Sequence, residues 1–258
     1  MAPPDRLRRD CRILAALAAL LWLAATAGPA VAADRAALLR AFEDAAFSYL
    51  PGAQVSRLLK WQGEVRIAGL GTPSRAMTLT VEELSRGIKN ATRLPMGYTG
   101  EGVNLLFVFS NRPEEDLTGK WADYAAPYFE SDEQFRQAAA SMTGPDAPLC
   151  IGKLVVVEQA IRAGLVVVRT DTAEDEAVQC LAHEFLGALG IIRTGRLPKD
   201  SLLQQPTKAF APGTPVALSD SDRALLWLIY HKDMTPGIAR AEGMDIARVL
   251  LDKVPGLK

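Results

Sequence analysis

The sequence predicts an α+β fold in which a small mixed sheet is covered by helices, with a helix-rich C-terminal half. Two observations lead to it. Short apolar runs of strand length alternate with segments of helical period, and further helical segments follow a pair of adjacent strand candidates. No linker or internal repeat divides the chain, so residues 34–258 are expected to form a single domain.

Composition excludes several classes of protein. The 258 residues are 49% apolar and 23% charged, which is typical of a globular chain. Lys and Arg number 29 against 30 for Asp and Glu, so no basic field is available to attract nucleic acid. With only two histidines and three cysteines, the chain lacks the ligands for a zinc ribbon or an iron–sulfur cluster.

The first 33 residues have the pattern of a secretory signal peptide. Four arginines precede or open an apolar run at 13–27, and small residues follow at 30–33. The run is short for a membrane span, although an uncleaved N-terminal anchor is the alternative. Cleavage would leave 25 basic and 28 acidic residues. We therefore expect an exported protein, periplasmic or secreted, with no transmembrane span after cleavage.

Two cysteines would remain after cleavage, Cys150 and Cys180. In an oxidising compartment an isolated pair forms the simplest disulfide, because no other connectivity exists. The alternative is a pair of free buried thiols. The sequence favours the disulfide.

Periodicity and turn residues place the secondary structure. A helix is expected at 34–50 and a strand at 65–70, after Trp61. The packing face of the last helix is expected at Ile246, Val249 and Leu250. The other expected elements are a helix opened by a capping box at 80–83, a central strand at 103–109, a helix at 131–142, a strand pair at 154–158 and 165–169, and helices at 173–189, 219–230 and 239–252.

The helix at 173–189 carries half of a metal-binding motif. His183 and Glu184 stand where a zincin places its first zinc ligand and the general base that activates the metal-bound water. The positions of the second and third histidines are occupied by Gly187 and Arg193. Glu184 would be catalytic only if the protein is active. A glycine within a helix also predicts that a ring or another helix packs close to Gly187.

A catalytic zinc needs three protein ligands, and His231 is the only other imidazole. His183 and His231 could be joined by a carboxylate from Asp220, Asp222 or Glu184, but nothing in their spacing brings them together. The favoured interpretation makes His183 a partly buried helix histidine that is hydrogen-bonded to backbone or to Glu184. No cofactor is therefore expected, and zinc is the alternative.

A turn follows His231. Met234 precedes Pro236 and Gly237, an arrangement similar to the methionine turn that lies under the zinc of metzincins as an apolar floor. A methionine before a Pro-Gly turn is also common for ordinary structural reasons. The three residues are therefore expected to form a structural turn.

Four segments together resemble the bacterial exported family called domain of unknown function 2927. The resemblance implies a zincin-like fold without the full set of metal ligands, and no established reaction. The usual residue at position 183 in that family is Glu, so His183 differs from the family and is closer to the metal-binding motif. The segment 194–217 is unlike the family. The segments are Arg57–Trp61 with Val65–Ile67, Cys180–Glu184 with Ala188–Gly190, Leu218–Asp222 with Leu225–Tyr230, and Thr235–Ile238.

These observations predict an exported protein of unknown biochemical role with a metallopeptidase-like scaffold and a degenerate zinc site. A binding or structural role in the cell envelope is favoured, with a peptide or an envelope protein as partner and no nucleic acid. The alternative is an active zinc-dependent peptidase that uses His183 and Glu184 with unconventional additional ligands.

Overall fold

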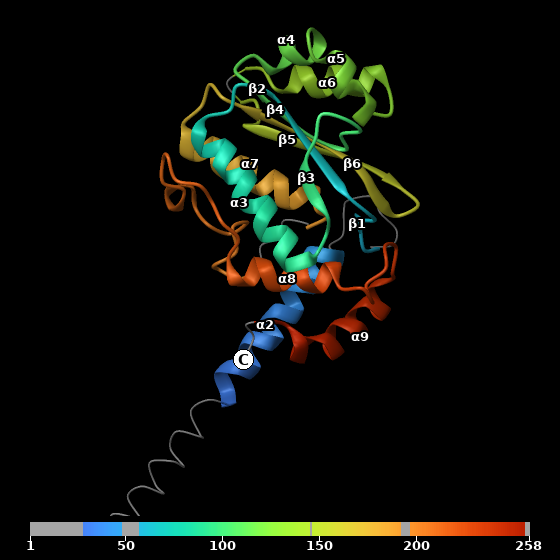
Figure 1. Cartoon of the computed structure of the whole chain (residues 1–258). Helices are drawn as coiled ribbons and strands as arrows, with labels where there is room; N and C mark the ends of the chain where they lie inside the picture. The colour runs from blue at the N-terminus through green and yellow to red at the C-terminus, as the bar shows by residue number, and fades with distance from the viewer. Residues whose placement is uncertain (1–27, 48–56, 145, 192–196, 256–258) are drawn as a thin grey trace, which may run out of the picture.

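The computed structural model describes residues 28–47, 57–144, 146–191 and 197–255, with side chains from Arg35 onward (Figure 1). The strands are β1 (Lys60–Trp61), β2 (Val65–Gly71), β3 (Met96–Tyr98), β4 (Leu105–Ser110), β5 (Cys150–Val157) and β6 (Ala160–Arg169). The α-helices are α2 (Gly28–Phe47), α3 (Arg75–Thr92), α4 (Pro113–Thr118), α5 (Ala122–Ala125), α6 (Asp132–Ser141), α7 (Glu174–Ala188), α8 (Asp220–Tyr230) and α9 (Arg240–Leu250). Short 3₁₀ turns lie at Ala126–Tyr128, Thr207–Ala209 and Leu251–Lys253.

The described strands form one mixed sheet. Its order is β1-β6-β4-β2-β3, and β5 also pairs with β6, outside this order. All pairings are parallel except that of β5 with β6, which is antiparallel. Parallel neighbours need a crossover, and α3 supplies it between β2 and β3. The predicted mixed sheet flanked by helices is confirmed, as is the central position of the strand expected at 103–109.

Helices cover both faces of the sheet, and β4 shows why its residues form a continuous apolar run. Phe107 packs into the core shared with α3, α7 and α8, whereas Leu106 and Val108 face the second core with α4 and α6. Every residue of β4 is buried. The two cores lie on opposite sides of the sheet, and Figure 1 shows α4, α5 and α6 gathered apart from α3, α7 and α8.

The predicted strand pair is confirmed as a hairpin with longer strands. A two-residue turn at Glu158 and Gln159 joins β5 to β6, and both residues have positive φ, 50° and 65°. Two positive φ values in succession are the geometry of a type I′ turn, whose twist matches that of the paired strands. β5 is thereby placed at an edge of the sheet, ahead of the helix that carries His183.

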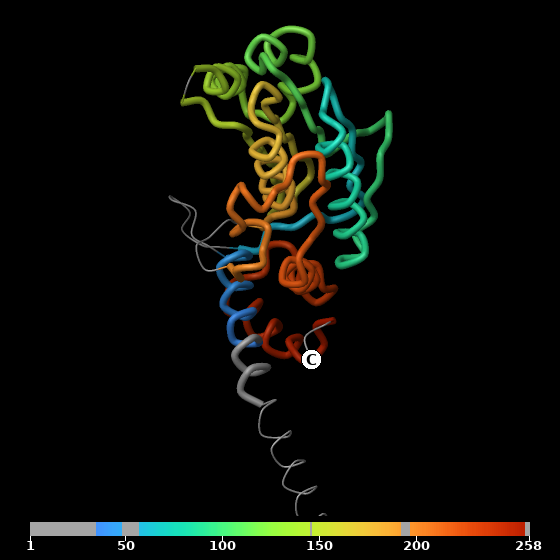
Figure 2. Tube along the Cα trace, turned by 90° about the vertical axis from the view of Figure 1, so that its left-hand side faces the viewer, coloured from blue at the N-terminus to red at the C-terminus, as the bar shows by residue number. Residues whose placement is uncertain are grey.

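α2 belongs to the fold. Ala41, Phe42 and Ala45 are fully buried, and the helix contacts α8 and α9. Figure 2 shows α2 alongside the C-terminal helices. The helix expected at 34–50 is confirmed, although it begins earlier than predicted and residues 48–50 lie outside the described part of the chain.

The predicted helix start at 80–83 is wrong. α3 begins at Arg75, and Ser74 is its N-cap, with a side chain that accepts a hydrogen bond from the Met77 amide. Thr80 is fully buried inside the helix, where its hydroxyl accepts a hydrogen bond from the Val216 amide. The Thr-x-x-Glu pattern therefore arose by chance within a helix that had already begun.

The predicted face of α9 is also partly wrong. Val249 is 66% exposed, whereas the helix buries Gly243, Met244, Ala247 and Leu250. A Cβ at position 243 would lie 2.5 Å from the Phe47 ring of α2, so a glycine is needed for the two helices to approach. The face of α9 that packs against α2 is therefore the one with Gly243 and Met244, and Val249 faces solvent.

The predicted signal peptide lies largely in residues 1–27, outside the described residues, and 28–33 form the first turns of α2. Among the helices that the structure describes, none has the length and apolar character needed to span a bilayer. Export remains a prediction.

Candidate functional site

α7 crosses beneath the β5–β6 hairpin and carries the His183–Glu184 pair. Its first turn holds Glu174, Asp175 and Glu176, whose negative charges complement the helix dipole at the N-terminus. It ends at Ala188, and Gly190, two residues later, has φ +86°. A Cβ there would lie 2.2 Å from the Leu59 carbonyl oxygen, so only glycine lets the chain pass so close to β1.

The predicted disulfide between Cys150 and Cys180 is present, with Cα atoms 6.0 Å apart. It joins the first residue of β5 to the first half of α7. The bond therefore fixes the edge strand above the helix at one end of the candidate site.

Glu184 lies directly against β5. A Cβ at Gly152 would be 2.2 Å from Glu184 Oε2, so the absence of a side chain at position 152 makes room for the carboxylate. Glu184 is partly buried. Gly152 was not predicted as part of the site, although a single glycine within an apolar strand is a known sign of close approach by another group.

The outer edge of β5 has unpaired backbone groups. The Arg169 amide donates to the Leu149 carbonyl, which sets the alternation of hydrogen-bonded pairs along β5 and β6. The N–H and C=O groups of Cys150, Gly152 and Leu154 therefore point away from β6. No backbone hydrogen bond within the described part of the chain uses them. This open edge runs beside Glu184.

His183 is buried and hydrogen-bonded to the fold. The residue is 9% exposed, and its Nε2 lies 2.8 Å from the Leu202 carbonyl oxygen. A carbonyl only accepts hydrogen bonds, so Nε2 carries the proton and donates it. The ring also meets the Phe210 ring edge to face, with centroids 6.2 Å apart. A nitrogen that donates to Leu202 has no lone pair for a metal.

The loop that carries Leu202 is held in turn by Asp222. Asp222 is 1% exposed and accepts hydrogen bonds from the Ser201 hydroxyl at 2.7 Å and the Leu202 amide at 3.1 Å. It also accepts from Ser219 within a capping box that opens α8. The helix start predicted at 219 is confirmed, and the acidic residue of its cap also positions the partner of His183.

Gly187 does not mark a close contact. A Cβ at this position would meet no described atom within 4 Å, apart from the backbone of its own helix. The expectation that a ring or a neighbouring helix packs there is therefore wrong for the described residues. Arg193 lies outside them.

His231 follows α8 and contacts Trp227 and Asp233. Its ring centroid is 4.9 Å from that of Trp227, and Nδ1 is 3.4 Å from Asp233 Oδ2. Burial is the largest influence and lowers the pKa of His231. Asp233 raises it, and Lys232, Lys253 and Lys60 lower it further. The imidazole is therefore neutral near pH 7.

The structure does not assemble the predicted donors into a metal centre. Asp222 is occupied by the loop at 201–202, and Asp220 is exposed and pairs with Arg223. Within the ranges that the structure describes, no three His, Cys, Asp or Glu side chains form a group that could hold a metal ion.

The predicted turn lies against β1. Met234 is fully buried, and its carbonyl oxygen accepts a 2.6 Å hydrogen bond from Lys60 Nζ. Gly237 has φ +78°, and its amide donates to the Leu58 carbonyl at 2.8 Å. Pro236 precedes it. The turn thus attaches the C-terminal helices to the first strand.

Lys60 is a buried cation that the sequence analysis missed. Its Nζ also donates to the carbonyl oxygens of Ile229 and His231, both at 3.3 Å, at the end of α8. Burial lowers the pKa of Lys60 to about 8. A lysine inside the apolar run 58–61 was the available signal.

A family model described as "Protein of unknown function (DUF2927)" matches residues 35–249. No match is found among curated proteins or among solved structures. The family match spans α2 to α9 and includes every residue of the site described above. The chain therefore belongs to this family of proteins of unknown function.

Proposed function

We propose that this protein is an exported binding protein with a metallopeptidase-like scaffold, whose zinc centre is degenerate and which holds an extended peptide along β5. The observation that carries the proposal is the hydrogen bond from His183 Nε2 to the Leu202 carbonyl. It uses the imidazole to hold the fold together at the position where a zincin would use it to hold a metal.

The arrangement of β5 supports a peptide as ligand. An extended peptide can join a sheet edge by pairing its backbone with unpaired N–H and C=O groups. Cys150, Gly152 and Leu154 present such groups, and the disulfide holds the strand in place. Glu184 lies beside this edge and would face a peptide without activating water, since the described residues offer no group of ligands for a metal next to it.

Removal of one outward N–H tests the proposal. Leu154→Pro deletes an amide that makes no bond to β6, whereas Leu154→Ala keeps that amide and removes the same side-chain packing. The probe is a fluorescein-labelled octapeptide of alternating threonine and valine, followed by fluorescence anisotropy. The same peptide with prolines at alternate positions is the probe control, because it lacks the N–H groups that augmentation needs.

We expect the wild type and Leu154→Ala to bind the probe and leave it intact by mass spectrometry. Leu154→Pro should lose binding, and the proline-containing peptide should not bind. Equal binding by the two Leu154 variants would refute capture along β5. Cleavage of the probe that is lost in Glu184→Gln would instead favour the active peptidase.

A further inference from the structure

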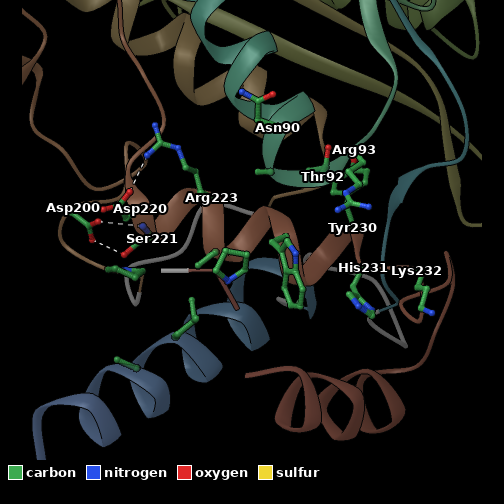
Figure 3. A pocket seen from close by; sticks show the side chains of 17 residues that line it. Asn90, Thr92, Arg93, Asp200, Asp220, Ser221, Arg223, Tyr230, His231 and Lys232 are labelled. Carbon is green, nitrogen blue, oxygen red and sulfur yellow. Dashed lines mark hydrogen bonds and ion pairs between the residues drawn. The ribbon is translucent and has the colours of Figure 1, made fainter. Parts of the chain in front are cut away.

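A second site lies away from β5, in a pocket of 1120 Å³ on one side of α8 (Figure 3). Residues on the α8 face, the last turn of α3 and one face of α2 line it, together with a loop at 198–200. It exceeds the size of a typical small-molecule pocket. Neither the His183 site nor the β5 edge contributes a lining residue.

Unpaired positive charge lies at one end of the pocket. Arg93 and Lys232 both line it, and within the described part of the chain neither side chain makes a hydrogen bond or an ion pair. The lining carboxylates are already engaged. Asp200 accepts from the Ser221 hydroxyl at 2.7 Å, and Asp220 pairs with Arg223 at 2.8 Å.

The backbone at Arg93 points to a use for its side chain. Arg93 is the C-cap of α3 and has φ 58°, in the left-handed region where glycine is favoured and other residues are strained. Figure 3 shows its guanidinium directed from the end of α3 toward α8. An exposed arginine therefore occupies a backbone position that suits glycine.

Arg93 and Lys232 are not needed as hydrogen-bond donors to the carbonyl groups at the helix ends. At the end of α8, the carbonyls of Ile229 and His231 already accept from Lys60. At the end of α3, the Ile88 carbonyl accepts from the Thr92 hydroxyl at 2.7 Å. Among the described residues, Arg93 and Lys232 have no such partners and are exposed to a ligand.

The rest of the lining is largely apolar. Trp227 lines the pocket from α8, and its ring packs against His231. Ala37, Leu38 and Ala224 add small apolar surfaces. A ligand that fits must therefore combine an anionic group with an apolar body.

We propose that this pocket binds a small anionic amphiphile, with a carboxylate or phosphate held by Arg93 and Lys232 and an apolar body along Trp227. Burial is the main reason that the pKa of His231 is lowered; Asp233 opposes the shift, and the neighbouring Lys232, Lys253 and Lys60 add to it. The site is independent of peptide capture at β5.

Two matched dyes test the charge requirement. The anionic probe is 1-anilinonaphthalene-8-sulfonate, and the neutral probe is N-phenyl-1-naphthylamine, which has the same aromatic body. Binding to the full mature chain is followed by dye fluorescence. Dodecanoate, dodecyl phosphate and inorganic phosphate serve as competitors and distinguish carboxylate, phosphate ester and free phosphate.

Arg93→Gly and Lys232→Gln should each weaken binding of the anionic dye by roughly tenfold or more, the effect of losing one charge-assisted hydrogen bond. The neutral dye should be unaffected. Arg136→Gln, on α6 on the other side of the sheet, should change the binding of neither dye. Arg93→Gly should melt at or above the wild-type temperature, because glycine relieves the left-handed strain, so lost binding would not reflect lost folding.

Dodecanoate or dodecyl phosphate should displace the anionic dye, and the more effective of the two identifies the anionic group. Unchanged dye binding in both Arg93→Gly and Lys232→Gln would overturn the proposal. Displacement by inorganic phosphate at the same concentration would overturn the requirement for an apolar body. Leu154→Pro should leave dye binding intact, which separates this proposal from the peptide site.

Discussion

Gly152 of β5 and Glu184 of α7 are complementary, since a Cβ on the glycine would lie 2.2 Å from the carboxylate oxygen of the glutamate. The contact joins the edge strand to the helix that carries His183. The disulfide from Cys150 to Cys180 joins the same two elements one turn of α7 away. Strand and helix are thus held together at two neighbouring points.

The Gly152–Glu184 contact predicts a coupled effect of two substitutions. Gly152→Ala should lower the free energy of unfolding by about 1 kcal/mol, because the Glu184 side chain must move, even though alanine usually suits a strand better than glycine. In a Glu184→Ala background the same change should be neutral or stabilising. Urea unfolding of the four proteins of this double-mutant cycle gives the coupling. Additive effects would show that the two residues do not restrict each other.

Asp222 should be among the most sensitive positions on α8. Asp222→Ala leaves the Ser201 hydroxyl and the Leu202 amide without their buried acceptor, and should destabilise the fold by about 3 kcal/mol. Asp220→Ala is the matched control, since its side chain is 97% exposed and should change stability by less than about 0.5 kcal/mol. Thermal unfolding measures both. Similar melting temperatures for the two variants would contradict the assigned role of Asp222.

The disulfide should contribute substantially to stability. Its cysteines are 30 residues apart, and closing a loop of that length stabilises a fold by about 3–4 kcal/mol in the chain-entropy model. The double variant Cys150→Ser/Cys180→Ser should show this loss in urea. Reduction of the wild type should give the same midpoint as the double variant. A reductant-insensitive wild type would indicate that the bond does not form in solution.

Lys60 should make stability depend on pH. Burial lowers its pKa from 10.5 to about 8, so above pH 8 the native state has released a proton that the unfolded chain still holds. The free energy of unfolding should therefore rise with pH from 8 to about 9.5, before tyrosines titrate. Lys60→Met, of similar length and without charge, should lack that rise. A wild type that parallels Lys60→Met over this range would mean that the three carbonyl acceptors keep the ammonium protonated.

Local patterns predicted most of the elements, and long-range contacts account for what they missed. Ser219 and Asp222 form a capping box at the predicted start of α8, and such a start is predictable because capping depends on residues three positions apart. The hydrogen bond from the Leu202 amide to Asp222 joins residues that are 20 positions apart. Leu202 lies in a connection without periodicity, so no local pattern could predict this bond. The two cysteines that follow the predicted signal peptide identified the disulfide, since they allow only one pairing.

The candidate site was predicted less completely than the fold. His183 was expected to be a partly buried helix histidine bonded to backbone or to Glu184, and it does bond to a backbone carbonyl. Its partner, Leu202, lies in the irregular connection between α7 and α8. Gly152 carried a recognisable signal, but the approaching group, Glu184, is on another element. The burial of the Lys60 ammonium was not predicted, because an apolar run indicates a buried strand whether or not one of its residues is charged.

The most direct test of the account is the zinc content of the mature chain, purified without a histidine tag and measured by inductively coupled plasma mass spectrometry. Because His183 Nε2 donates to Leu202 and no second imidazole lies one turn later, the wild type and His183→Ala should both carry far less than one zinc per chain. One tightly bound zinc per wild-type chain, lost in His183→Ala, would contradict the claim that the centre is degenerate.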